Sequence, residues 1–439
     1  MIDVQFANIP GMLEDTLRDV LVESSLRGED YDPLDVSSQI TVLKDTKLML
    51  CKLRGTYMRG EATSDTSWLP SRINSRITRF PIEGVINPKK SCMKARIGRI
   101  KSDVDLSVEI KALDGKLNII TGRKGTGKSH LSKLLVLSLV DHMAPSLILD
   151  VNGEYVNLSR SRKSGNSSYD GKIHVLTPGL NLRFSPNEVG LRAFLSMLIF
   201  ALDLPSTSAR VFSTIWHSLQ AEGKLSVENI VEAVRRWDCH ESVRDALQSR
   251  MNTIVDLRIF MEQEGSVGFN YIVEEFRKGH AIVINMKDKS STARRIIVEL
   301  LLSKLTDLLS NSTLRALFLF AEEAHLYLRE TYWDDVVTRM RHLGFFTTFI
   351  TNQPNTISES IYRQADNLFV FNFTNEHDLE VVSRAAKIDV DSMKMLAKDL
   401  PAHHCLIVGD AVKDFPVIVG VRELDVETMG ETRFFFQNQ

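Results

Sequence analysis

The sequence has few cysteines and no long apolar run. It is 439 residues long and contains four cysteines, which form no C-x-x-C pair and match no metal-site histidine spacing: Cys51, Cys92, Cys239 and Cys405. We therefore expect neither a zinc site nor a disulfide framework, and a reducing, intracellular setting is favoured. The longest apolar stretches, near 195–204 and 296–302, are too short to cross a membrane. No secretory signal opens the chain either, so a cytoplasmic protein is expected.

The chain also has no large excess of charge of either sign. It contains 54 Lys and Arg residues and 56 Asp and Glu residues, for a formal net charge of −2. This balance neither supports nor excludes nucleic acid as a partner, because a basic pore can be offset by an acidic exterior. With 43% hydrophobic residues the chain is typical of a globular protein with a large core, and its length predicts two or three domains.

A glycine-rich motif of the form G-x-x-x-x-G-K-S is the strongest pattern in the sequence. An apolar run at 117–121 precedes it and predicts a buried strand, and the stretch 130–140 that follows predicts a buried helix. Strand, glycine loop and helix together make a phosphate cradle, in which loop N–H groups and the helix N-terminus converge on the phosphates. The alternative is an ordinary glycine-rich turn. The predicted nucleotide-binding residues are Gly122, Arg123, Lys124, Gly125, Thr126, Gly127, Lys128, Ser129 and His130.

A second motif supplies the carboxylates that a P-loop ATPase needs. The apolar run at 317–321 predicts a strand that ends in Glu322 and Glu323. We expect Ser129 and Glu322 to hold a Mg²⁺ ion, and Lys128 to reach the β- and γ-phosphates of ATP. Glu323 would polarise the attacking water. The alternative is an acidic helix start, where the helix dipole favours glutamate.

Two further carboxylates follow the strand predicted at 147–151. Asp150 lies at the end of this strand, and Glu154 comes after the turn at 152–153. Because the carboxyl ends of strands in such sheets line the ligand crevice, both side chains are expected to face the nucleotide. The alternative is a strand followed by an ordinary turn.

Strands alternate with helices from residue 117 onward, which is typical of an α/β fold with a parallel sheet covered on both faces. Further strands are predicted at 173–176, 281–285, 346–351, 368–373 and 405–408. The predicted parts are an ATPase core at 96–186 and 279–439, an inserted α-helical subdomain at 187–278, and a small, mostly β N-terminal module at 1–95. In and next to that module, a helix is expected at 12–26 and short strands at 40–43, 47–50, 82–86 and within 97–108.

Taken together, the motifs resemble the HerA family of hexameric DNA-translocating ATPases, within the HerA/FtsK superfamily of P-loop NTPases. The P-loop, the D-x-x-G-E-Y at 150–155, the helical insertion and the E-E-A-H at 322–325 follow the family's order. Further segments look like its R-K-x-G, S-Q-R-P and L-T-N-x-x-D motifs and its closing strand, at 341–344, 349–354, 373–378 and 400–409. The resemblance covers about 97–422 and implies a RecA-like P-loop ATPase domain.

The resemblance also implies a composite active site. Asp150, Glu154 and Glu323 would act on ATP bound to their own subunit. Asn352 would occupy the γ-phosphate sensor position. Arg341 would be an arginine finger for the neighbouring subunit's ATP, since a trans arginine neutralises phosphoryl charge only when subunits are docked. The alternative for Arg341 is a solvated basic helix end.

The sequence departs from the family pattern at three places. Glu322 stands where a generic motor has Asp, and Asn352 and Gln353 replace Gln and Arg. The segment 402–404, Ala-His-His, replaces a G-E segment. These differences indicate a divergent branch.

Two basic segments are candidates for DNA contact. The loop at 159–165 and the segment 287–289 would line a pore and touch backbone phosphates without base-specific contacts. The alternative is a disordered, solvated loop.

We therefore expect a hexameric, Mg²⁺-ATP-driven translocase or helicase that moves double-stranded DNA through its central pore in repair, mobile-element transfer or anti-phage defence. No nuclease signature is found, so a nuclease or effector would be a separate partner chain. One alternative is an ATP-binding ring scaffold that regulates such an effector without processive translocation. Another is a small-molecule P-loop kinase, against which the tandem carboxylates, the helical insertion and the candidate finger argue.

Overall fold

The computed structural model of this chain falls into two compact units, Met1–Ile77 and Thr78–Gln439. In the first unit, β1 (Asp3–Phe6) pairs antiparallel with β2 (Lys47–Leu50), and β3 (Thr56–Met58) pairs antiparallel with β4 (Glu61–Thr63). The helix expected at 12–26 and the strands expected at 40–43 and 82–86 lie outside the described residues. The residues that the structure describes are 3–6, 47–50, 56–58, 61–63, 67, 93–100, 104–162, 168–260, 265–327, 341–385, 390–427 and 429.

The second unit is built around a mixed sheet of 11 strands. Their order across the sheet is β6-β5-β15-β14-β13-β7-β12-β11-β8-β10-β9. The strands are β5 (Lys94–Ile100), β6 (Val104–Glu109), β7 (Asn118–Thr121), β8 (Ser146–Asp150), β9 (Ile173–Leu176), β10 (Ala281–Asn285), β11 (Leu317–Glu322), β12 (Phe345–Thr351), β13 (Asn367–Val370), β14 (His404–Gly409) and β15 (Val417–Val421).

The sheet is parallel only in part. From β13 to β9 every neighbouring pair is parallel, whereas β14, β15, β5 and β6 pair antiparallel. The expected α/β class is confirmed, but the expectation of a purely parallel sheet is wrong for β14. The connection from β14 to β15 spans only 410–416, which is long enough for a hairpin and too short for a crossover.

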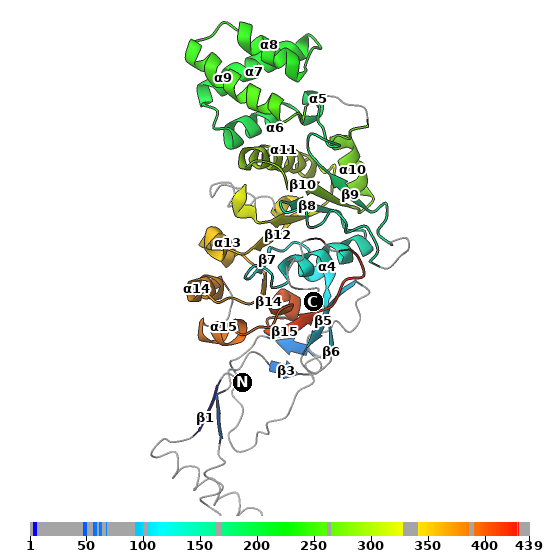
Figure 1. The fold of residues 1–439 in the computed structure, drawn as a ribbon, viewed down its shortest axis with the longest axis vertical. Helices are drawn as coiled ribbons and strands as arrows, with labels where there is room; N and C mark the ends of the chain where they lie inside the picture. Colours follow the sequence, from blue (N-terminus) through cyan, green and yellow to red (C-terminus); the bar gives the residue numbers. More distant parts are fainter. Residues whose placement is uncertain are drawn as a thin grey trace, which may run out of the picture. The chain divides into compact units, whose positions relative to one another are not determined.

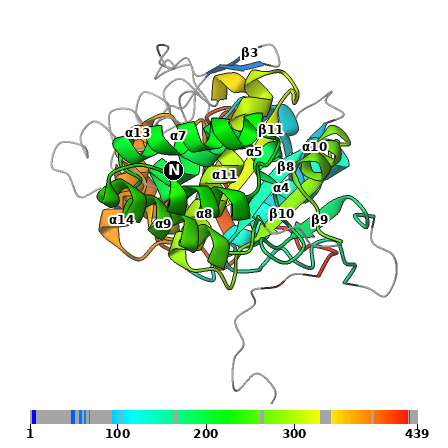
Figure 2. The same ribbon diagram turned by 90° about the horizontal axis from the view of Figure 1, so that it is seen from above.

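The central parallel strands are buried along their whole length. Every residue of β7, β8 and β11 is buried, and most of these residues are apolar. Such runs favour strands with helices on both faces, because neither face then meets water. In Figures 1 and 2, α4 (Lys128–Asp141) and α10 (Phe269–Arg277) lie on one side of these strands, and α13 (Glu359–Arg363) and α14 (Glu376–Ala385) on the other.

A group of helices lies between β9 and β10, in the stretch whose pattern predicts helix. They are α5 (Pro186–Val189), α6 (Leu191–Ser196), a π-helical turn (Met197–Ala201), α7 (Ser206–Ala221), α8 (Val227–Arg236), α9 (Glu241–Asp256) and α10. Aromatic packing joins α6, α7 and the segment after α9, since the ring of Phe194 lies 5.5 Å from that of Phe212, 5.2 Å from Trp216 and 5.1 Å from Phe260. Rings attract one another at these separations. Helices α7, α8 and α9 also pack against one another, at the top of Figure 1.

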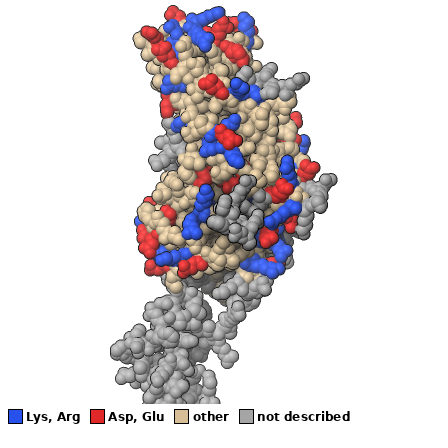
Figure 3. All heavy atoms as spheres, in the orientation of Figure 1, with Lys and Arg blue, Asp and Glu red and all other residues tan. Residues whose placement is uncertain are grey.

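The remaining helices follow β10. They are α11 (Ser291–Ser310), α13, α14 and α15 (Val390–Ala397), with short 3-10 turns at Ala324–Leu326, Pro354–Thr356 and Asp410–Val412. A further 3-10 turn, Ile110–Ala112, lies between β6 and β7. Among the described residues, no helix combines the length and apolar character needed to span a membrane. On the face drawn in Figure 3, Lys and Arg are interspersed with Asp and Glu.

Candidate active site

The carboxyl ends of four parallel strands bring most of the predicted site residues to one edge of the sheet, called here the nucleotide edge. β7 leads into the loop 122–129, the P-loop, while β8 ends at Asp150 and β11 ends at Glu322. β12 is followed directly by Asn352, and its last residue, Thr351, pairs with Thr121 at the end of β7. Parallel strands end at the same edge, so these groups converge although they are far apart in the sequence.

Glycines give the P-loop its shape. Gly125 has φ of 79° and Gly127 has φ of 113°, conformations that residues with a side chain rarely adopt. A Cβ at Gly127 would also lie 3.1 Å from Nδ1 of His403, which is tighter than an ordinary contact. Gly127 immediately precedes α4, whose first-turn N–H groups have no partners within the helix. The loop and the helix start thus have the form of an anion cradle.

Lys128 is buried within this loop. Its side chain donates to the carbonyl oxygen of Arg123 at 3.0 Å, and the Thr126 hydroxyl donates to the same oxygen at 2.7 Å. Burial lowers the pKa of Lys128, while the charges of Glu323 and Glu322 act in the opposite direction. The Lys128 ammonium therefore lies near the carboxylates of the nucleotide edge. It is hydrogen-bonded to a carbonyl oxygen that a phosphate oxygen can replace.

The two residues predicted to hold Mg²⁺ are in contact. The Ser129 hydroxyl donates to Oε1 of Glu322 at 3.0 Å. The other oxygen, Oε2, is buried and has no hydrogen-bond partner among the described residues. Burial raises the pKa of Glu322 well above its usual range, because the charged carboxylate has lost its water. A hydroxyl and a carboxylate with one unpaired, buried oxygen form a hard oxygen donor set, so these two residues fit Mg²⁺.

Glu323 lies beside Glu322 in a strained backbone conformation. Its φ of 44° and ψ of 47° are left-handed, which is uncommon for a residue with a side chain and recurs at functional sites. Its Oε2 accepts from the backbone N–H of Asn352 at 3.4 Å and lies 3.6 Å from Nδ1 of His325. The side-chain oxygen of Asn352 is buried and unpaired among the described residues. Burial raises the pKa of Glu323, the direction that suits a general base working near neutral pH.

The Asp150 carboxylate at the end of β8 is turned toward the backbone of the loop that follows the strand. Asp150 is fully buried, and its carboxylate accepts backbone N–H groups from Gly153 at 2.7 Å and from Glu154 and Tyr155 at 3.0 Å each. Burial raises its pKa in spite of these hydrogen bonds. The turn that it fixes carries Glu154, whose carboxylate lies 3.7 Å from Nζ of Lys133 on α4. The carboxylate of Asp150 thus fixes the turn that carries Glu154.

The C-terminal segment, residues 403–429, contacts α4 and the P-loop. No sequence motif indicated these contacts. Nε2 of His130 hydrogen-bonds with the carbonyl oxygen of Arg422 at 2.8 Å, and Lys133 donates to the carbonyl of Met429 at 2.9 Å. The backbone N–H of His403 donates to a P-loop carbonyl at 2.9 Å. His130 was predicted among the nucleotide-binding residues, yet its side chain is engaged by this segment. The only sequence feature that marks the segment is the departure from the family pattern at 402–404.

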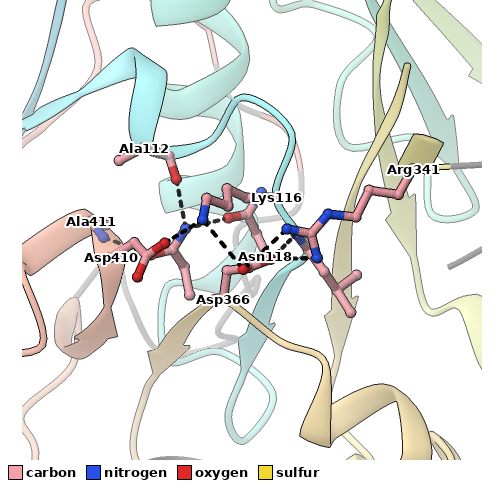
Figure 4. A network of polar contacts seen from close by, with 9 residues as sticks. Ala112, Lys116, Asn118, Arg341, Asp366, Asp410 and Ala411 are labelled. Carbon is pink, nitrogen blue, oxygen red and sulfur yellow. Dashed lines mark hydrogen bonds and ion pairs between the residues drawn. The ribbon is translucent and has the colours of Figure 1, made fainter. Parts of the chain in front are cut away.

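A second polar cluster, called here the amino-edge cluster, lies before the amino ends of β7, β12 and β13 (Figure 4). Asp366 is at its centre. Its carboxylate pairs with the guanidinium of Arg341 through two contacts of 3.2 Å, accepts from the ammonium of Lys116 at 3.5 Å and from the backbone N–H of Leu117 at 2.8 Å. Lys116 also pairs with Asp410, and this hydrogen bond raises the pKa of Lys116.

Arg341 is therefore at the opposite edge of the sheet from the P-loop of its own subunit. It precedes β12, and the seven residues of that strand, at about 3.3 Å each, separate it from Asn352 by roughly 23 Å. No arginine side chain reaches along a strand of this length. The structure thus brings together the P-loop, Glu322, Glu323 and Asn352, and places Arg341 elsewhere.

Known proteins share parts of this sequence and its fold. Residues 95–305 match the family model described as helicase HerA, central domain. The DNA double-strand break repair helicase HerA of Sulfolobus acidocaldarius is 20% identical over 450 residues, which cover 95% of this chain and 85% of that protein.

Two solved structures have a similar fold. VirB4 of Thermoanaerobacter pseudethanolicus superimposes with a TM-score of 0.57 at 12% identity, over 76% of this chain and 98% of that one. The plasmid coupling protein TrwB, solved in complex with ADP and Mg²⁺, gives a TM-score of 0.54 at 14% identity, over 78% of this chain and 92% of that one. At these identities the likeness shows the fold alone, a mixed α/β P-loop ATPase fold.

Proposed function

Because the chain is a distant homologue of HerA helicases and carries their central domain at residues 95–305, we propose that it is a Mg²⁺-ATP-dependent DNA translocase with a RecA-like core. The working form is a ring, which we take to be a hexamer. It moves double-stranded DNA through its central pore, in repair, mobile-element transfer or anti-phage defence. The repair function in the name of the Sulfolobus relative makes repair the first of these to examine.

One observation carries the proposal: the parts of an ATPase site are present, but on opposite edges of one sheet. The nucleotide edge holds the P-loop, the Ser129–Glu322 pair and Glu323. The amino edge holds Arg341, which is about one strand length away and cannot serve its own subunit. A head-to-tail ring resolves this, because such an interface brings one edge of a subunit against the opposite edge of the next.

Each residue then has a defined task. Lys128 and the P-loop N–H groups bind the phosphates, and Ser129 and Glu322 hold the Mg²⁺ ion, which when bound neutralises phosphate charge. Glu323 accepts the proton of the attacking water, and Asn352 contacts the γ-phosphate. Asp150 holds the turn that presents Glu154.

Arg341 completes the site from the neighbouring subunit. Its guanidinium stabilises the charge on the transferring phosphoryl group. Hydrolysis is therefore tied to subunit docking, which is the condition for coordinated movement around a ring.

DNA contact is proposed for basic side chains at or near the nucleotide edge. Arg160, Arg162 and Lys287 are exposed, and Lys287 follows the carboxyl end of β10. Together they supply the sequence-independent phosphate contacts that a translocase needs. A nuclease or other effector would be a separate protein, since the motifs found here all belong to nucleotide hydrolysis.

The test is the ATPase rate with and without linear duplex DNA at two salt concentrations, together with the mass of the assembly in solution. A hexamer whose turnover rises with DNA, and loses that rise at high salt, supports the translocase. Triple substitution of Arg160, Arg162 and Lys287 by alanine should remove the DNA effect and keep basal turnover. A ring whose turnover ignores DNA contradicts the motor and favours an ATP-binding scaffold for an effector.

A further inference from the structure

A cluster of His and Glu side chains lies at the amino ends of β9 and β10, apart from the nucleotide edge and from the amino-edge cluster. His174 is on β9, the edge strand of the sheet, Glu275 is on α10, and His280 immediately precedes β10. β9 is five strand positions from β7 in the sheet, or roughly 24 Å at about 4.8 Å per strand. The cluster is therefore separate from the nucleotide site, and the proposed function uses none of its residues.

Three side-chain atoms of this cluster converge on one point. Oε2 of Glu275 lies 2.6 Å from Nδ1 of His280 and 2.9 Å from Nε2 of His174, and the two nitrogens are 3.4 Å apart. In a tetrahedral site with ligand bonds of about 2.0–2.1 Å, ligand atoms lie about 3.3–3.4 Å from one another. Small side-chain rotations would bring all three separations to that value.

The surroundings orient these ligands as a metal site requires. The Tyr271 hydroxyl lies 2.8 Å from Nδ1 of His174, which leaves Nε2 for the cluster. The ammonium of Lys278 donates to Oε1 of Glu275 at 2.7 Å, so this contact uses the oxygen that does not face the histidines. Metal-binding histidines and carboxylates in proteins are held by second hydrogen bonds of this kind.

The chain reversal after α10 brings His280 back to Glu275. Gly279 has φ of 78°, and a Cβ there would lie 2.3 Å from the carbonyl oxygen of Met143. The backbone N–H of His280 then donates to the carbonyl of Glu275 at 3.1 Å. Glycine is thus required for the turn that places the two ligands together.

We propose that His174, Glu275 and His280 bind one divalent transition-metal ion, for which Zn²⁺ is the best fit. Two imidazole nitrogens favour Zn²⁺ over Mg²⁺ or Ca²⁺, which prefer oxygen ligands. Glu275 is 6% exposed and the histidines 18% and 20%, so a water completes the coordination from the solvent side. The ion joins the edge strand β9 to α10 and β10, and so fixes the end of the helical group to the sheet. The cysteine and histidine spacing in the sequence predicts no zinc site. These ligands include no cysteine and are far apart in the sequence, so that spacing could not reveal them.

The full-length protein, treated with chelator and desalted, is titrated with Zn²⁺ by calorimetry and with Co²⁺ by visible absorption, without nucleotide. We expect one ion per chain and a melting temperature that rises with Zn²⁺. His174→Asn and His280→Asn should each weaken binding at least about a hundredfold, and Tyr271→Phe about tenfold. His217→Asn, which changes an exposed histidine of α7, is the matched control and should bind as the native chain does.

Three results would overturn this site. Absence of stoichiometric binding to the native chain would leave only a hydrogen-bonded His–Glu–His cluster, whatever the variants do. Binding that survives in folded His174→Asn and His280→Asn chains would place the ion elsewhere. Binding that is lost in Glu322→Gln instead would assign it to the nucleotide edge. Since the readout is metal binding, failure of the ATPase proposal would leave this inference untouched.

Discussion

The two edges of the sheet differ in how completely their polar groups are paired. At the nucleotide edge, buried oxygens of Glu322 and Asn352 have no hydrogen-bond partner among the described residues. At the amino edge, Asp366 is paired with a guanidinium, an ammonium and a backbone N–H. The neighbouring Asn367 donates to two oxygens and accepts from the N–H of Ala411 at 2.7 Å. Buried oxygens at the first edge are therefore unpaired, whereas the carboxylate at the centre of the second is paired within its own subunit.

This difference bears on how a ring would work. Unpaired buried oxygens destabilise a protein until a ligand pairs with them, so the nucleotide edge favours binding. Arg341, in contrast, has a carboxylate partner that it must share or exchange to reach a phosphoryl group. β7 joins the two edges, with the P-loop at its carboxyl end and Leu117, bonded to Asp366, before its amino end.

Replacement of Arg341 should have the largest effect on turnover. Arg341→Ala should lower kcat by about 10³- to 10⁵-fold, as expected for loss of an arginine finger, and leave ATP binding intact. Turnover and nucleotide affinity are measured on the same ring. Arg363→Ala, which changes an exposed arginine of α13, is the control and should be near native. Normal hydrolysis by Arg341→Ala would show that the finger assignment is wrong.

A mixed ring then tests whether the finger acts in trans. Arg341→Ala and Glu323→Gln subunits are each inactive alone, but an interface that combines Glu323 of one with Arg341 of the other is intact. About one quarter of the interfaces in an equimolar head-to-tail ring have this arrangement. Activity should therefore appear on mixing. If the mixture stays inactive while mixed rings demonstrably form, the two residues do not meet across an interface.

Replacement of Glu323 should have the next largest effect. Glu323→Gln removes the proton acceptor but keeps the size of the side chain, so kcat should fall by about 10²- to 10⁴-fold with ATP still bound. Single-turnover hydrolysis separates this loss from slow product release. If Glu323 is only an acidic residue at a helix start, the Glu323→Gln variant should have near-native turnover. Glu359→Gln, an exposed glutamate of α13, is the matched control.

Asp366→Asn should have a smaller, more selective effect. The substitution removes the charge that holds the guanidinium of Arg341, so kcat should fall roughly tenfold to a hundredfold at unchanged KM. Asp366→Glu should recover part of the loss. Asp410→Asn, which affects Lys116 but not Arg341 directly, is the comparison. A rise in kcat for Asp366→Asn would mean that the pair restrains the arginine instead of positioning it.

Much of the nucleotide edge could be predicted because its pattern is local in the sequence. Each carboxylate follows an apolar strand, and parallel strands end at one edge, so their convergence follows from topology. β7, β8, β11 and β12 lie within a residue or two of the expected bounds. The glycine loop needs no tertiary information either, since its turn and its helix start are adjacent in the chain.

The unpredicted features all depend on contacts between distant residues. Asp150 looks like a ligand for the nucleotide until its three backbone hydrogen bonds are seen. Asp366 has no motif, and its role appears only when Lys116 and Arg341 meet at the amino edge. His174 and Glu275 are likewise about a hundred residues apart, so no spacing rule connects them.

Replacement of Glu322 should have the smallest effect, which is a change in thermal stability. The direction of its pH dependence follows from the raised pKa of Glu322. Burial raises its pKa in the folded state above the ordinary value of 4.5, so from pH 4.5 up to the raised pKa the folded chain binds more protons than the unfolded one. The stability contribution of Glu322 is therefore full below pH 4.5 and is lost as the pH rises through the raised pKa. Glu322→Gln lacks this loss, so without ligand its melting temperature should exceed the native one by a few degrees near neutral pH.

The pH profile decides whether this destabilisation comes from the charge of Glu322. The gap in melting temperature between Glu322→Gln and the native chain should be small below pH 4.5 and widen above it. Mg²⁺-ATP should reverse the order, because only the native carboxylate gains a cation. A gap that is constant with pH would show instead that the variant merely packs better. In that case the nucleotide edge would be no more strained without ligand than the amino edge.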